Sequence, residues 1–145
     1  IANAPHPKKE AEGIVEYVDL ETLLKESDII SLHCPLNDSS RGLINKERIA
    51  LMKPTAIVIN AARGPVVDSP ALADALNEGR IAGAGIDVFE VEPPLDVNHP
   101  LLHSKNTIVT PHVAFASAES MEARCHIVFD NITKWLAGEQ VNVIL

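Results

Sequence analysis

Four short apolar runs, each rich in β-branched residues, are spaced along the chain and predict strands. They cover residues 28–33, 56–60, 83–89 and 107–110. Within each run the apolar residues are nearly continuous and do not alternate with polar ones. Continuous apolar strands are typical of parallel sheets that helices cover on both faces. The pattern therefore predicts a parallel sheet whose two faces are buried.

Helix-like segments lie between these runs. Three of them are marked by residues that cap helices: residues 20–26 after Asp19, residues 46–52 after Asn45, and the segment that begins after Asp68, with Pro70 in its first turn, and ends at Gly79. Strands and helices therefore alternate along the chain, which is the pattern of right-handed α/β units. We expect an α/β fold in which helices flank a parallel sheet.

A longer helical pattern covers residues 117–137, and Gly138 ends it. Its apolar residues form one stripe: Met121, Cys125, Val128, Ile132 and Trp135. An apolar stripe of this length has to be buried against other protein. Packing into a core, in this chain or in a neighbouring domain, is the simpler interpretation. A dedicated surface for a partner is the alternative.

Composition and charge exclude several classes of function. The chain has 145 residues, of which 46% are hydrophobic and 22% charged, which suits one packed domain or part of a larger one. The net charge of −8 and the lack of a long basic run argue against binding of nucleic acid or anionic lipid. No apolar stretch approaches the roughly 18 residues of a membrane span, and no signal-peptide pattern begins the chain.

The two cysteines bear on compartment and metal binding. Cys34 and Cys125 are far apart in the sequence and match no metal-binding or redox spacing. Free thiols in a reducing compartment are the simplest interpretation. We therefore expect a cytoplasmic protein without a metal site or a disulfide scaffold.

Residues that can do acid–base chemistry follow the predicted strands, where ligands of parallel sheets bind. Arg63, Glu92 and His112 come after the second, third and fourth runs. An arginine can hold a carboxylate with two hydrogen bonds, a histidine can exchange a proton near neutral pH, and a glutamate can orient that histidine. Each residue alone is more often a solvated charge or a structural group. Their convergence on one sheet edge favours a catalytic site.

Four blocks of the sequence resemble the signature of the D-isomer-specific 2-hydroxyacid dehydrogenases. They are residues 60–68, 83–93, 98–102 and 110–112, in the family's order and over essentially the whole chain. The resemblance implies a Rossmann-like sheet and hydride transfer between NAD and a small D-2-hydroxy acid or 2-oxo acid. It also implies a homodimer of the complete protein. A non-catalytic, NAD-sensing relative of the corepressor kind, which binds protein partners, is the alternative.

The resemblance also implies roles for individual residues. Arg63 matches the arginine that binds the substrate's carboxylate and carbonyl. His112 matches the residue that protonates the carbonyl oxygen, and Glu92 the acid that pairs with it. Asp87 matches an aspartate that contacts the nicotinamide end of the cofactor. Further residues are expected to line the cofactor groove, largely through their backbone: Cys34, Pro35, Ser40, Ala61 and Ala62.

The family's glycine-rich dinucleotide fingerprint is absent from this sequence. Gly83 and Gly85 do not replace it, because a buried strand follows them where a helix would have to hold the pyrophosphate. We therefore expect residues 1–113 to be the second half of an NAD-binding domain that lacks its first βαβ unit. Residues 114–145 are expected to return toward an absent substrate domain. Because the chain begins at Ile1 without Met, we also expect preceding residues. Without the pyrophosphate site and the substrate domain, we expect no activity of the chain alone.

Two departures from the family bear on the choice of ligand. The acidic residue that contacts the adenosine ribose in the family aligns with Ala4, and His6, Lys8 and Lys9 follow it. NADP is therefore an alternative to NAD. Farther along, Phe115 stands where many relatives carry paired glycines. It either fills part of the substrate pocket or packs under the last helix.

Overall fold

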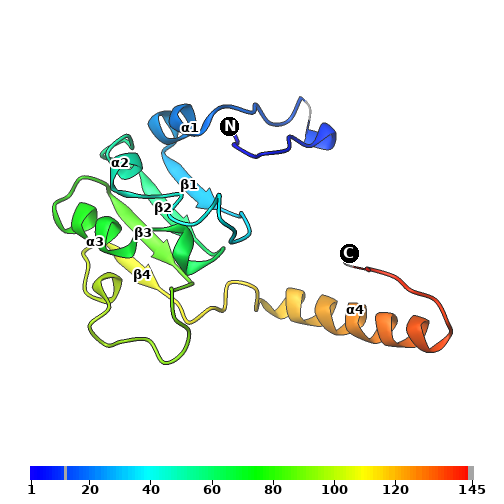
Figure 1. Ribbon diagram of the computed structural model, residues 1–145. Helices are drawn as coiled ribbons and strands as arrows, with labels where there is room; N and C mark the ends of the chain where they lie inside the picture. The colour runs from blue at the N-terminus through cyan, green and yellow to red at the C-terminus, as the bar shows by residue number, and fades with distance from the viewer. Residues whose placement is uncertain (12, 144–145) are drawn as a thin grey trace. The chain divides into compact units, whose positions relative to one another are not determined.

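Four parallel strands run side by side in one sheet (Figure 1). They are β1 (Ile29–Leu32), β2 (Ile57–Asn60), β3 (Gly83–Ile86) and β4 (Thr107–Val109), and they pair in the order of the sequence. The computed structural model describes residues 1–11 and 13–143. The chain divides into two compact units, Ile1–Pro111, which holds the sheet, and His112–Leu145. The expected α/β fold with a parallel sheet is confirmed.

Helices precede and connect the strands, and their first turns are capped as predicted. α1 (Leu20–Glu26), α2 (Lys46–Ile49) and α3 (Ser69–Asn77) each begin after a side chain that accepts a backbone hydrogen bond, namely Asp19, Asn45 and Asp68. Gly79 follows the end of α3 with a φ of +71°, the left-handed conformation that closes many helices. Short 3-10 turns are η1 (Lys9–Ala11), η2 (Gly64–Val66) and η3 (Pro100–Leu102).

α2 is shorter than the predicted helix over residues 46–52. It ends at Ile49, and the N–H groups of Leu51 and Met52 donate to carbonyls three residues earlier. The residue before a proline is sterically disfavoured in the helical conformation. The chain therefore leaves the helix before it reaches Pro54.

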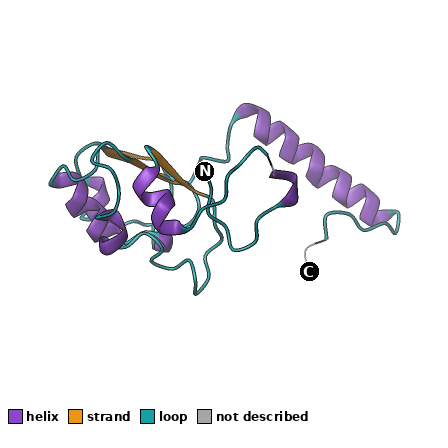
Figure 2. Ribbon diagram, turned by 90° about the horizontal axis from the view of Figure 1, so that it is seen from above, coloured by secondary structure: helices purple, strands orange, loops and turns teal. Residues whose placement is uncertain are grey.

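One face of the sheet carries the core, and the other face is exposed. Ile30, Leu32 and Val58 pack in one cluster with side chains of the helices, among them Leu24, Ile49, Leu72 and Leu76. On the opposite face the exposed fractions are 61% for Ile29, 38% for Ile57, 36% for Ile59 and 73% for Ile108. The prediction that both faces are buried is wrong for the part of the chain that the structure describes. The strands pair in the order of the sequence, and right-handed crossovers between them place α2 and α3 on the same face of the sheet. α1 lies on this face too (Figure 2).

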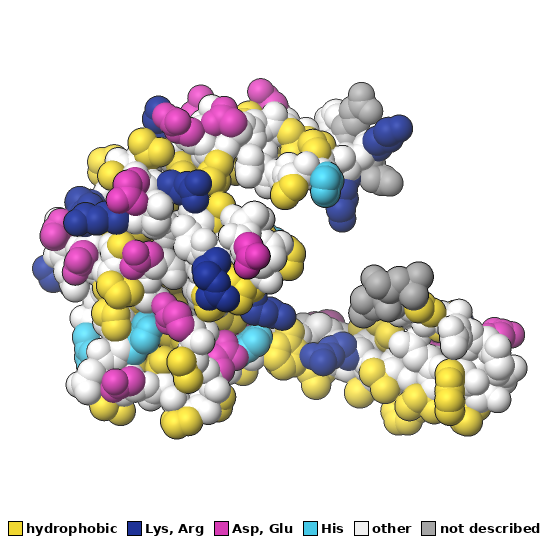
Figure 3. All heavy atoms as spheres, in the orientation of Figure 1, with side chains coloured by type: hydrophobic (Ala, Val, Ile, Leu, Met, Phe, Trp, Pro, Cys, Tyr) yellow, Lys and Arg dark blue, Asp and Glu magenta, His cyan; other side chains and the backbone are white. Residues whose placement is uncertain are grey.

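The second unit contains α4 (Ala118–Leu136) and the segment after it. Ser117 caps α4 by accepting a hydrogen bond from the Ser120 N–H at 3.2 Å. No residue of α4 is buried, and its apolar stripe is exposed (Figure 3): Met121, Cys125, Val128, Ile132 and Trp135. Within the second unit this stripe is therefore not part of a core. None of the described helices is long and apolar enough to cross a membrane.

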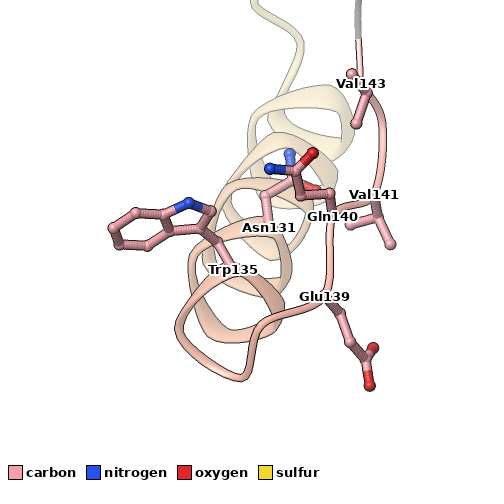
Figure 4. Close-up of a pocket in the computed structure, with 6 residues that line it drawn as sticks. All are labelled: Asn131, Trp135, Glu139, Gln140, Val141 and Val143. Atoms are coloured by element: carbon pink, nitrogen blue, oxygen red, sulfur yellow. The ribbon is translucent and has the colours of Figure 1, made fainter.

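The segment after α4 turns back along the helix. The Glu139 N–H donates to the Lys134 carbonyl, and Nδ2 of Asn142 donates to Oδ1 of Asn131, both at 2.9 Å. An open hollow of about 320 Å³ lies between the helix and this segment (Figure 4), lined by Asn131, Trp135, Glu139, Gln140, Val141 and Val143. Glu139 is the single charged side chain among the described residues of this lining.

Candidate active site

The loop after β2 carries Arg63, and a buried amide holds it in place. Asn60, the last residue of β2, is 1% exposed. Its Oδ1 accepts a hydrogen bond from the Ala62 N–H at 3.1 Å, and its Nδ2 donates to the Arg63 carbonyl at 3.0 Å. Because both ends of this buried amide are bonded, the backbone of the loop is fixed. Arg63 itself is exposed, and its Nη1 donates to the Ala62 carbonyl at 2.6 Å.

Gly64 is the point at which this loop touches the segment after β3. A Cβ added to Gly64 would collide with the backbone of Phe89 and Glu90. The two backbones therefore approach each other as closely as the absence of a side chain allows. This contact fixes the loop of Arg63 against the segment that leads to Glu92.

Asp87 directly follows β3 and is 5% exposed. The hydroxyl of Thr110, the residue after β4, donates a hydrogen bond to Oδ1 of Asp87. The Asp87 N–H donates to the Asn60 carbonyl at 2.9 Å. The Asp87 carboxylate therefore has a fixed position at the carboxyl ends of β2, β3 and β4.

Glu92 lies on the exposed segment that follows Asp87. Its Oε1 accepts a hydrogen bond from the Phe89 N–H at 3.3 Å, so the side chain folds back toward the end of β3. The sequence places Glu92 six residues beyond β3. Its position therefore depends on how this segment is held.

Glu90 and His99 form a hydrogen-bonded pair on the same segment, and neither was assigned a role in the site from the sequence. Nε2 of His99 lies 3.0 Å from Oε2 of Glu90. Partial burial raises the pKa of Glu90, but hydrogen bonds from Ser69, from its own backbone and from His99, together with the charge of His99, outweigh this effect. The net result is a Glu90 pKa below its ordinary value.

The five residues expected to line a cofactor groove are in and near the loops after β1 and β2. Ser40 is buried, and its hydroxyl donates to the Pro35 carbonyl at 2.6 Å while accepting from the Asn37 N–H at 2.9 Å. Ser40 thus holds the loop after β1 in shape. Ala62 is buried and Cys34 packs against the core, whereas Pro35 and Ala61 are exposed.

His112 is the first residue of the second unit. It is half-buried and has a φ of +57°, in the left-handed region. Its ring stands edge-on to the ring of Phe115, with the centroids 6.3 Å apart. The guanidinium of Arg124, on α4, lies over the Phe115 ring, 4.8 Å from its centroid. Phe115 is thus held by Arg124 and is 48% exposed.

The structure brings Arg63, Asp87 and Glu92 to the loops that follow β2 and β3, in the first unit. Asn60, Gly64, Glu90 and His99 lie in the blocks that carry the resemblance, but sequence reasoning assigned them no role in the site. They act through contacts between loops. The one local signal was for Asn60, a polar residue that ends an apolar run. Gly83 and Gly85 lie inside β3, as expected, and form no phosphate-binding loop.

A parallel sheet with fixed polar groups at the carboxyl ends of neighbouring strands is the arrangement of α/β domains that bind nucleotide cofactors. Residues 1–114 match the model of one such family, described as "D-isomer specific 2-hydroxyacid dehydrogenase, NAD binding domain". The chain belongs to this family, and the resemblance carried by its sequence blocks is confirmed.

Similar proteins include reductases and dehydrogenases of small acids. The chain is 45% identical over 128 residues to a hydroxypyruvate reductase of Blautia hydrogenotrophica, covering 88% of this chain and 39% of that protein. It is 50% identical over 125 residues to a glyoxylate reductase of Thermofilum pendens, covering 86% of this chain and 37% of that protein. The crystal structure of D-lactate dehydrogenase with NAD⁺ from Lactobacillus jensenii has a TM-score of 0.86 at 36% identity, covering 99% of this chain and 47% of that one. The chain therefore spans less than half the length of these relatives.

Proposed function

We propose that this chain forms part of an NAD-dependent dehydrogenase that interconverts small D-2-hydroxy acids and 2-oxo acids. The observation that carries the proposal is the placement of Arg63, Asp87 and Glu92 on loops that follow neighbouring strands, in a chain of this family. Residues 1–113 would then be the second half of the NAD-binding domain. Residues 114–145 would return toward the substrate domain, and the exposed stripe of α4 supports this assignment.

In this mechanism the exposed guanidinium of Arg63 binds the carboxylate of the substrate with two hydrogen bonds. His112 donates the proton to the carbonyl oxygen of the 2-oxo acid. Glu92 would pair with His112 and orient its imidazole for this proton transfer. Arg63 and His112 thereby orient the carbonyl carbon and supply the charge that the transition state needs.

The described residues fit the nicotinamide end of NAD. Pro35 and Ala61 are exposed on the loops after β1 and β2, and the Asp87 carboxylate is held by Thr110 at the end of β3. NAD, when bound, supplies or accepts the hydride. Cys34, Ser40 and the buried Ala62 would complete this groove, and the Ser40 hydroxyl holds the loop after β1 through its hydrogen bond to the Pro35 carbonyl.

NADP is a second candidate cofactor for the same groove. Ala4 brings no carboxylate to repel a 2′-phosphate, and Lys8 and Lys9 are exposed nearby in the sequence. Competition between NADH and NADPH for the full protein, measured over a range of salt concentrations, tests this choice. A strict preference for NADH contradicts the use of NADP.

The setting proposed for the full protein is a homodimer in the cytoplasm that does not bind nucleic acid. The net charge of −8 disfavours contact with phosphate backbones. The two cysteines are free thiols, which suits a reducing compartment. The homodimer rests on the family resemblance, and the mass of the full protein in solution tests it.

To test this proposal, the full protein is mixed with NADH and with glyoxylate, hydroxypyruvate or pyruvate. Oxidation of NADH is then measured as the loss of its absorbance. We expect turnover with at least one of these acids. Arg63→Ala and His112→Ala should each abolish most of it and leave NADH binding intact, because neither residue is assigned to the cofactor.

Arg80→Ala is the matched control for the loss of an arginine. Arg80 lies between α3 and β3, and its ion pair with Glu78 is 2.8 Å long. Its loss should leave turnover unchanged, because Arg80 precedes β3 while the site residues follow it. Unchanged rates in the Arg63 or His112 variant would contradict the assignment. NADH binding without turnover of any acid would instead favour a sensing protein.

A further inference from the structure

Glu90 and His99 form a pair that the proposed mechanism does not use. The exposed fractions of the two side chains are 13% for His99 and 35% for Glu90. The ring of Phe89 stands edge-on to the His99 ring, with the centroids 5.1 Å apart. The pair is thus partly shielded from water, where a hydrogen bond is stronger than on an open surface.

The second ring nitrogen of His99 is also engaged. Nδ1 accepts a hydrogen bond from the Leu101 N–H at 3.3 Å, and His99 thereby caps η3. Leu101 is buried in the core of the first unit. Because Nδ1 accepts, the proton of a neutral imidazole lies on Nε2, which donates it to Glu90. His99 therefore joins Glu90 to an element that is anchored in the core.

The segment enclosed by this pair, residues 91–98, has little burial of its own. Seven of its eight residues are exposed, and Leu95 is half-buried. Segments with few buried contacts open at low free-energy cost unless their ends are tied. Glu92 is on this segment, two residues from Glu90. The backbone of Glu90 also lies against Gly64, the neighbour of Arg63.

We propose that Glu90 and His99 are positioning residues that tie the two ends of the segment 91–98 and so hold Glu92 in place for proton transfer. Glu90 connects this segment to η3 through His99 and to the loop of Arg63 through Gly64. The role of Glu92 in this proposal rests on the proposed function. The joining of the two ends of the segment by Glu90 and His99 does not depend on that function.

Two substitutions of His99 separate its two hydrogen bonds. In His99→Asn the side-chain oxygen replaces Nδ1 and can still cap η3, but the side chain is too short to reach Glu90. In His99→Gln the side-chain amide nitrogen replaces Nε2 and can still donate to Glu90. A third variant, Glu90→Ala, removes the other partner. Asp28→Asn is the control. Asp28 precedes β1 and forms a 2.9 Å ion pair with Lys53, which precedes β2, so this variant breaks an ion pair outside the segment 91–98.

In the full protein, His99→Asn and Glu90→Ala should lower kcat for reduction by about ten- to a hundredfold, the effect of a small displacement of a catalytic group. KM for the 2-oxo acid and Kd for NADH should stay within about twofold, since Arg63 and the cofactor groove are unchanged. His99→Gln should restore most of kcat. A merely structural role would lower Tm without changing kcat at temperatures well below Tm.

Amide hydrogen exchange over residues 91–98 gives a readout that does not need turnover. Exchange should be faster in His99→Asn and Glu90→Ala than in the parent protein. In His99→Gln and Asp28→Asn it should be as slow as in the parent. Unchanged exchange in both of the first two variants overturns the proposal. Faster exchange with an unchanged kcat overturns the positioning of Glu92. If the parent turns over no acid, the proposed function fails, and exchange alone decides whether the tie exists.

Discussion

Gly64 shows how much one residue without a side chain contributes to the site. Gly64→Ala should lower the free energy of unfolding by about 1–3 kcal/mol, the usual cost of overpacking. The added Cβ would collide with the backbone of Phe89 and Glu90, which cannot move aside as a flexible side chain can. Chemical denaturation of parent and variant measures the difference.

Gly85→Ala is the control for this substitution. A Cβ at Gly85 meets Cγ1 of Ile59 at 3.9 Å, which is an ordinary contact. This variant should be as stable as the parent or slightly more stable, because alanine restricts the unfolded chain. Equal stabilities of the two alanine variants would contradict the close contact at Gly64.

The lowered pKa of Glu90 makes a prediction for the pH dependence of stability. A carboxylate whose pKa is lower in the folded state stabilises the fold above its unfolded pKa of about 4.5, and this contribution is lost as the pH falls through the folded value. Glu90→Gln should therefore be less stable than the parent at pH 7. The difference should shrink at pH values below about 4.5. Unfolding curves across this range test it, and a constant difference would be contrary to the prediction.

At the scale of single residues, the sequence could show which chemical groups follow the strands but not what holds them. Arg63 and Asp87 lie at strand ends, as expected for a parallel sheet. The tie between Glu90 and His99 and the contact of Gly64 with Phe89 join residues that are 9 and 25 positions apart. Such contacts depend on the course of whole loops, which a pattern of hydrophobic positions does not encode.

At the scale of elements, the side chain of Asp68 caps the first turn of α3, and one substitution tests how much this cap contributes to stability. Oδ1 of Asp68 accepts a hydrogen bond from the Ala71 N–H at 3.0 Å. Asp68→Ala should lower the free energy of unfolding by about 1 kcal/mol, because it leaves a helix N–H group without this acceptor. Thermal or urea denaturation measures the loss.

Asp74→Ala separates the cap from the general effect of removing an aspartate. Asp74 is exposed in the middle of α3. Alanine has the higher helix propensity, so this variant should match or slightly exceed the parent in stability. A similar loss in both variants would show that the cap is not the cause.

Capping residues predicted the helices well because caps act within one turn. α1 has the bounds that the sequence predicts, and Asp19, Asn45 and Asp68 all accept the expected backbone hydrogen bonds. The coverage of the sheet was predicted wrongly because it depends on which elements lie on its second face. Continuous apolar residues in β1 and β2 show that a face is suited to burial, and not that this chain buries it.

At the scale of the whole molecule, the exposed face of the sheet should govern how the 145-residue chain behaves when it is produced by itself. Ile29 and Ile108 are 61% and 73% exposed on strands at opposite edges of the sheet. We expect self-association that increases with concentration, since exposed apolar strands pair with other copies. Sedimentation velocity over a concentration series detects it.

Ile108→Lys should weaken this association by placing a charge on the apolar face. Ile14→Lys is the matched control, because Ile14 is an isoleucine that is 83% exposed outside the sheet. It should leave the association as it is. A monomer at every concentration, or an equal effect of the two lysines, would rule out the sheet face as the cause.

The order of the strands has a further consequence for biosynthesis. β2 pairs with β1, β3 with β2 and β4 with β3. Each of these strands therefore leaves the ribosome when its partner has already been made, and none has to wait for a later part of the sheet. The sheet can grow in the direction of translation, one βα unit at a time, so that the order of synthesis and the order of assembly coincide.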